Sequence, residues 1–115
     1  MEAKTITSAL DADVQLTNNE KRILWAFSNN EYTANNVDEH GIGGGTWTFA
    51  IIDNAGGLSQ QAAGGVLSSL IKKGLVHVDG DYTVGNECET TASLTARGKD
   101  YAVTLGLVFG STRPE

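Results

Sequence analysis

The sequence predicts an α+β domain with a core of three helices, followed by a β-hairpin and a last helix. Three observations favour this class. A Thr17-x-x-Glu20 capping box opens the first helix, and a later amphipathic run ends at Gly74. Two apolar stretches then flank the turn dipeptides Asp79-Gly80 and Gly85-Asn86, a pattern typical of a hairpin.

The length of 115 residues permits one domain with a hydrophobic core. We expect an N-terminal arm over residues 1–16, the folded domain over 17–106 and a C-terminal tail over 107–115. No run of apolar residues is long enough to span a membrane, and no signal peptide opens the chain. The single cysteine, Cys88, excludes an internal disulfide. These features predict a cytoplasmic protein without a membrane segment.

The first helix should begin after Thr17 and run to about Ser28, with Ile23, Leu24 and Phe27 on its buried face. The stretch that follows, as far as Gly45, is rich in asparagine and glycine, which predicts a long loop.

Residues 46–54 are compatible with a buried strand or a short helix, because β-branched and aromatic side chains favour a strand. We predict a helix, since Ala55-Gly56-Gly57-Leu58 looks like the tight turn between two helices. Ser59 then provides a good N-cap for the next helix.

That next helix, residues 59–73, has two distinct faces. Helical spacing puts its apolar residues on one side, where they should pack on the two preceding helices: Ala63, Val66, Leu67, Leu70 and Ile71. The opposite side carries Gln61, Gly65, Ser68 and Lys72.

The hairpin, or wing, should pair a strand over 75–78 with a strand over 90–94. Thr95 then caps a last helix that ends at Gly106. The apolar segment Leu107-Val108-Phe109 needs a cover, which either the domain's own core or a second subunit could supply.

The segment from Leu58 to Tyr101 resembles winged helix-turn-helix regulators of the multiple-antibiotic-resistance-regulator (MarR) type. The likeness rests on Val66-Leu67-x-x-Leu70-Ile71-Lys72-Lys73-Gly74-Leu75-Val76 and on Ser93-Leu94-Thr95-x-x-Gly98. It implies a winged helix-turn-helix fold and a DNA-binding transcriptional regulator, with double-stranded DNA and a second copy of the chain as partners. In that family the recognition helix enters the major groove, and the wing contacts the adjacent backbone or minor groove.

Carried over position by position, the resemblance places one set of residues against DNA: Ser59, Gln60, Gln61, Gly65, Ser68, Lys72 and Lys73. Glutamine can read adenine, serine can bind a phosphate or a base edge, and lysine supplies charge. Further phosphate contacts would come from basic residues that start the first and last helices: Lys21, Arg22, Arg97 and Lys99. Dimerisation would use the N-terminal arm and the apolar residues 105–109.

The charge balance supports a second hypothesis. Eight basic residues against fourteen acidic ones give a net charge of −6, the reverse of what nucleic-acid binding favours. Four carboxylates lie in the predicted wing without a lysine or arginine among them: Asp79, Asp81, Glu87 and Glu89. The alternative is therefore an acidic winged-helix protein-interaction module, an inhibitor or adaptor, which captures a basic protein partner and does not bind DNA.

The sequence contains no residue pattern that strongly indicates a catalytic or metal-binding site. Cys88 and His77 could approach each other across the hairpin, but no orienting group or oxyanion hole accompanies them. Asp38-Glu39-His40 are adjacent residues, whose side chains do not all converge on one ion. The glycine-rich segment 41–46 lacks the lysine of a phosphate-binding loop. We therefore expect neither an enzyme nor a bound cofactor or metal.

Overall fold

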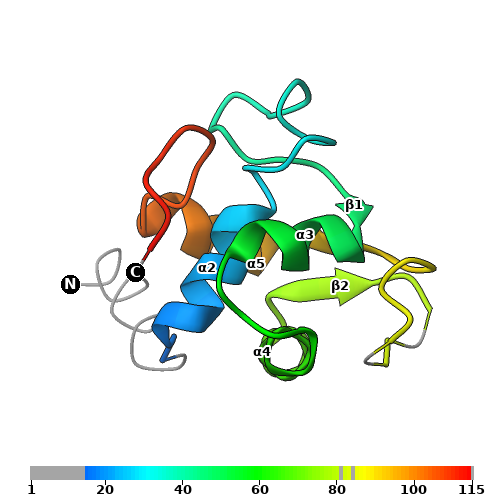
Figure 1. Cartoon of the computed structure of the whole chain (residues 1–115). Helices are drawn as coiled ribbons and strands as arrows, with labels where there is room; N and C mark the ends of the chain where they lie inside the picture. The colour runs from blue at the N-terminus through cyan, green and yellow to red at the C-terminus, as the bar shows by residue number, and fades with distance from the viewer. Residues whose placement is uncertain (1–14, 81, 84, 115) are drawn as a thin grey trace.

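A computed structural model of the chain describes residues 15–80, 82–83 and 85–114. Within them the elements follow in the order α2 (Asn18–Ala26), β1 (Thr46–Trp47), α3 (Thr48–Ala55), α4 (Gln60–Lys72), β2 (Val76–Val78), β3 (Thr91–Leu94) and α5 (Ala96–Thr104) (Figure 1). The prediction of a small α+β domain is confirmed. Of the predicted N-terminal arm, all but residues 15 and 16 lies outside the described residues.

The three strands form an antiparallel sheet in the order β1-β3-β2. Val76 pairs with Leu94 and Val78 with Ala92, which confirms the predicted hairpin strands. On its other edge β3 pairs with β1, and Thr46 lies opposite Ala92. The central strand therefore joins the hairpin to the segment that precedes α3.

The segment 46–54 contains both structures that the sequence allowed. Thr46 and Trp47 form β1, and the helix begins at Thr48, so the predicted helix is confirmed except for its first two residues. Pairing with β3 explains the difference, because β-branched and aromatic residues suit a strand. The N-cap of α3 is Trp47, which makes no side-chain capping bond.

The predicted caps of three helices are confirmed. The Thr17 hydroxyl accepts from the Glu20 amide at 3.1 Å, and the Glu20 carboxylate accepts from the Thr17 amide at 2.8 Å. The Ser59 hydroxyl accepts from the Ala62 amide and starts α4. Thr95 accepts from the Gly98 amide and starts α5. Each side chain satisfies one of the backbone N–H groups that a helix leaves free at its first turn.

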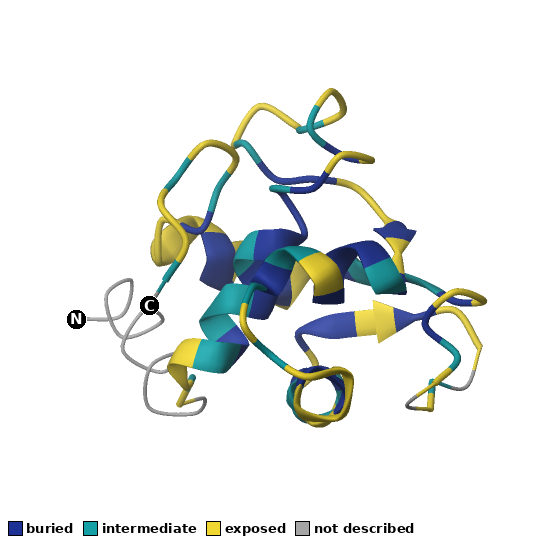
Figure 2. Cartoon of the chain, viewed as in Figure 1, coloured by how far each residue is buried: buried dark blue, intermediate teal, exposed yellow. Residues whose placement is uncertain are grey.

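The core lies where α2, α3, α4 and the sheet meet, as the buried faces in Figure 2 show. It contains the predicted faces of the first helix and of α4, although Val66 and Ile71 are only partly buried. Its largest fully buried apolar side chains are Phe27, Ile23, Leu24, Ile51, Leu67, Leu70 and Leu75. Among the described residues, no helix has the length and apolar character to cross a membrane.

The C-terminal segment packs back on α2 and the loop after it. Leu107 is buried in the core, and the Trp25 indole donates to the carbonyl of Ser111 at 2.9 Å. The Phe109 amide donates to the Gly41 carbonyl, yet the Phe109 side chain stays 47% exposed. The domain's own core thus covers only part of the apolar segment 107–109.

Candidate functional site

The outer side of α4 is the main exposed surface that the sequence singled out. Gln61, Gly65 and Lys72 are exposed there, and Ser68 is partly buried. We call these four residues the α4 face. A Cβ atom at Gly65 would meet nothing within 4 Å, so packing inside the domain does not require a glycine at this position.

Three other residues predicted to face DNA make contacts within the domain. Ser59 uses its hydroxyl as the N-cap of α4. Gln60 donates from its amide to the Glu87 carboxylate at 2.8 Å. Lys73 is bound to Glu20 through both carboxylate oxygens, at 2.7 and 2.9 Å, and donates to the Gln15 carbonyl at 2.7 Å. The α4 face is therefore narrower than the predicted set.

Glu20 ties α2 to the C-terminal end of α4. Its side chain is only 4% exposed, and it also accepts from the Ser69 hydroxyl at 2.7 Å. Burial raises the pKa of this carboxyl, but bonds from Lys73, Ser69 and the Thr17 backbone outweigh it, and the pKa lies below its ordinary value. Lys73 is thus a structural counter-ion that fixes the end of α4.

The predicted phosphate contacts are spread over several elements. Arg22 donates to the carbonyls of Pro114 and Gly56, at 2.9 and 3.4 Å, and so holds the C-terminal segment and the α3–α4 turn. The Arg97 guanidinium lies 5.8 Å from the centre of the Tyr101 ring. Lys21 is partly buried, and Lys99 is exposed on α5.

The acidic residues of the wing do not form one exposed set. Asp79 is exposed, accepts from the Thr91 hydroxyl at 2.9 Å and lies 3.3 Å from His77. Glu89 is exposed, whereas Asp81 lies outside the described residues. Glu87 turns inward and is 3% exposed.

Glu87 holds the wing loop against α4. Its carboxylate accepts from the Tyr82 hydroxyl at 2.7 Å, from the Gly85 amide at 3.0 and 3.1 Å and from Gln60. Burial raises the pKa of Glu87, but these bonds outweigh it and leave the pKa below its ordinary value. The sequence analysis grouped Glu87 with the wing carboxylates that would capture a basic partner, because no local pattern distinguishes it from its acidic neighbours.

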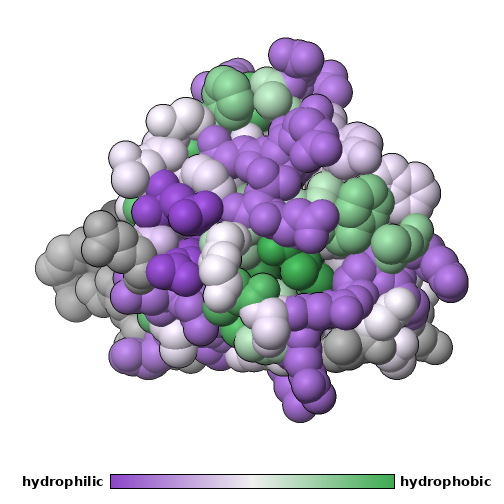
Figure 3. Space-filling model, viewed as in Figure 1, coloured by the Kyte–Doolittle hydropathy of each residue, from purple (hydrophilic) through white to green (hydrophobic). Residues whose placement is uncertain are grey.

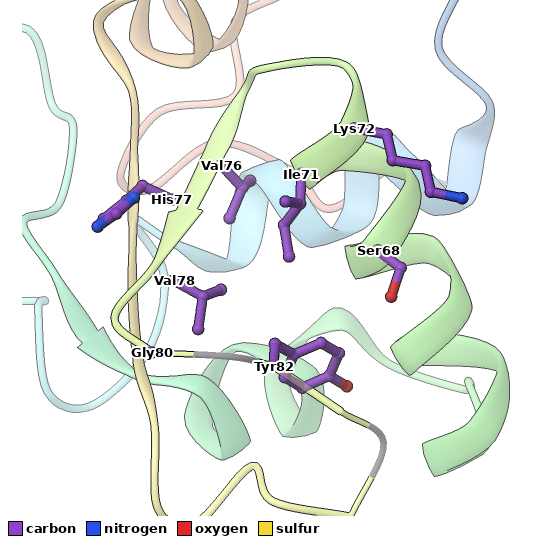
Figure 4. Close-up of a pocket in the computed structure, with 8 residues that line it drawn as sticks. All are labelled: Ser68, Ile71, Lys72, Val76, His77, Val78, Gly80 and Tyr82. Carbon is purple, nitrogen blue, oxygen red and sulfur yellow. The ribbon is translucent and has the colours of Figure 1, made fainter.

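A groove of about 340 Å³ lies between the C-terminal half of α4 and β2 (Figure 4). Ile71, Val76 and Val78 make its apolar part, and Tyr82 closes it from the wing loop. Lys72 belongs to its helix side, with the ammonium group pointing away from β2 in Figure 4. This groove joins the α4 face to the wing in one continuous surface.

The two candidate catalytic residues, Cys88 and His77, line different hollows of the surface. Cys88 is exposed, and His77 pairs with Asp79. Asp38 accepts from the amides of His40 and Ile42, so its carboxylate closes a turn of the loop. In the part of the chain that the structure describes, no three histidine, cysteine, aspartate or glutamate side chains gather as a metal site would require.

Comparisons with protein-family models, with curated proteins and with solved structures found no match to this chain.

Proposed function

We propose that this chain is a winged-helix domain that binds double-stranded DNA through the α4 face and regulates transcription as a dimer. The order of elements and the β1-β3-β2 sheet are compatible with that fold. The observation that carries the proposal is the α4 face itself. It is a polar helix surface free of acidic side chains, displayed by a helix that packs on α2 and α3 through its other side.

The turn between α3 and α4 supports this arrangement. Gly56 and Gly57 have positive φ angles of 81° and 73°, a backbone conformation that glycine adopts without strain. The turn is short, because α3 ends at Ala55 and α4 begins at Gln60, with Ser59 as its N-cap. Two helices joined in this way fit the helix-turn-helix motif, whose second helix enters the major groove.

Different parts of the α4 face have different roles in this proposal. Gln61 lies in the first turn of α4, where a recognition helix contacts base edges, and its amide can pair with adenine. Lys72 lies in the last turn and supplies charge for a phosphate. Because few lysine or arginine side chains are exposed near the α4 face, the affinity for DNA should fall only gently as the salt concentration rises. Two phosphate contacts would give a slope of log K against log salt of about −2.

Fluorescence anisotropy of a labelled duplex, titrated at several salt concentrations, tests the proposal. Gln61→Ala should weaken binding to a selected site by about 1–3 kcal/mol and reduce discrimination between sequences. Lys72→Ala should weaken binding to all duplexes and reduce the salt slope by about 1. Thr104→Ala, on the exposed surface of α5, is the control and should bind like the original protein. Absence of binding at low salt would refute the proposal.

A second candidate is the acidic protein-interaction module, and the exposed carboxylates of Asp79 and Glu89 favour it. In this function the wing would capture a basic protein, and DNA would not bind. Replacement of Asp79, Asp81 and Glu89 by their amides should then abolish capture of that partner. Glu87 is not part of this test, because its carboxylate is bonded within the domain.

A further inference from the structure

A second cavity, of about 420 Å³, lies between α3, the α3–α4 turn and the loop that carries Glu87. Its lining combines apolar side chains, from Phe49, Ile52 and Leu58, with polar ones, from Asp53, Gln60 and Glu87. The space-filling view shows hydrophobic surface in the middle of this face of the molecule (Figure 3). The volume falls within the range of about 300–1,000 Å³ that is usual for small-molecule sites.

The aromatic wall of this cavity is held in place. The Phe49 ring is stacked beside Trp47, with centroids 6.3 Å apart and planes at 29°. Tyr32 meets Phe49 edge-on, with centroids 5.9 Å apart. The Phe49 amide also donates to the Glu87 carbonyl at 3.2 Å, which ties this wall to the opposite loop. A ring held in this way needs little further ordering when a ligand packs against it, so the entropic cost of binding is low.

Among the described residues that line the cavity, the charged ones are both acidic. Asp53 is exposed on α3, and Glu87 lies on the other side with its carboxylate bonded to Gln60, Tyr82 and Gly85. No lysine, arginine or histidine belongs to the lining as far as the structure describes it. Arg22 and Arg113 contact the turn at Gly56, but neither lines the cavity.

We propose that this cavity binds a small organic cation. The apolar part of the ligand would pack against Phe49, Ile52 and Leu58, and its positive group would lie over the Phe49 ring and toward Asp53. Glu87 contributes negative potential from the opposite wall without giving up its own hydrogen bonds. None of the four residues of the α4 face is among the described residues that line the cavity, so cation binding can be tested separately from the proposed DNA contact.

Three probes of similar size test the role of charge: benzyltrimethylammonium, neutral N-benzylacetamide and the anion phenylmethanesulfonate. Each is titrated into the full chain without DNA, and amide chemical shifts are followed by NMR. The cation should bind about two- to fivefold more tightly than the neutral probe, and the anion most weakly. Shifts should centre on the amides of Phe49, Asp53 and Gly85. Equal affinity for all three probes, shifts elsewhere or no shifts with any probe would overturn the proposal.

Variants separate the contributions of charge and of the ring. Asp53→Asn should remove most of the preference for the cation, because it deletes the exposed charge and keeps the side chain's shape. Asp100→Asn makes the same change at an exposed position of α5 outside the described cavity lining, and should leave all affinities unchanged. Phe49→Leu should weaken cation binding about two- to fivefold through loss of the ring face. Should Phe49→Leu fail to fold, the comparison of Asp53→Asn with Asp100→Asn still decides the proposal.

Discussion

Replacement of Glu20 by glutamine should destabilise the domain by about 2 kcal/mol at neutral pH. The carboxylate accepts from the Thr17 amide, the Ser69 hydroxyl and the Lys73 ammonium group. Glutamine can keep the bond from Thr17, but its NH₂ group would face the Lys73 ammonium group. A fully buried pair would cost about 3–5 kcal/mol when broken. Here the Lys73 side chain is 30% exposed and can regain water, which lowers the expected cost.

Urea unfolding followed by fluorescence and circular dichroism measures this effect. With a slope of about 1.5 kcal/mol/M, the urea midpoint should fall by about 1.3 M. Two controls match the two partners of the ion pair. Glu39→Gln alters a carboxylate that is 84% exposed in the loop, and Lys72→Met alters the exposed lysine next to Lys73. Both should change stability by less than about 0.5 kcal/mol.

The pH dependence provides a stricter test of the Glu20 prediction. The pKa of Glu20 in the folded protein lies below its ordinary value of 4.5, so the unfolded chain takes up a proton first as the pH falls. The stabilisation is therefore complete above pH 4.5 and is lost as the pH falls through the folded pKa. The difference between the original protein and Glu20→Gln should shrink in acid. A difference that is equal at pH 7 and pH 3 would refute the ion-pair explanation.

Two further predictions concern glycines and assembly. Gly98→Ala should destabilise the domain by more than about 3 kcal/mol, because its Cβ would overlap the Leu75 carbonyl. Gly65→Ala should stabilise the domain by about 0.5–1 kcal/mol, because a Cβ there meets nothing within 4 Å and alanine favours the helix. Thermal melts of the two variants measure both effects. If the proposed dimer uses the exposed side chains of Leu105 and Phe109, Leu105→Ser and Phe109→Ser should shift sedimentation toward the monomer without lowering the melting temperature of the monomer. A monomer at all concentrations in the original protein would contradict the dimer.

The helices and their caps were predictable because their signals are local. The Thr17-x-x-Glu20 box, the Ser59 cap and the spacing of Ala63, Leu67 and Leu70 each depend on residues within a few turns of one helix. The hairpin was also predicted from a local signal, the turn dipeptides Asp79-Gly80 and Gly85-Asn86. Strand β1 was missed because two residues carry no periodicity, and only pairing with β3 makes them a strand.

The site was predicted less completely than the fold, because its contacts are distant in sequence. Gln60 and Glu87 are 27 positions apart, and Glu20 and Lys73 are 53 apart. Sequence spacing showed which residues share a helix face, but not which of them a distant carboxylate would engage. Phe49 and Asp53 were not considered as ligand contacts, since the cavity exists only where α3 meets the wing loop.

The acidic and basic side chains around α4 are arranged along the helix dipole. Carboxylates of Asp53 and Glu87 lie near its N-terminal end, and Lys72 and Lys73 lie at its C-terminal end. This order complements the helix dipole at both ends and stabilises α4. The two carboxylates lie beside the start of the helix, and the α4 face itself carries none. A duplex can therefore approach the α4 face although the whole chain has a net charge of −6. A duplex would have to place its phosphates near the Lys72 end, and only neutral side chains would meet the bases. That orientation distinguishes the proposed mode of binding from one driven by a broadly basic surface.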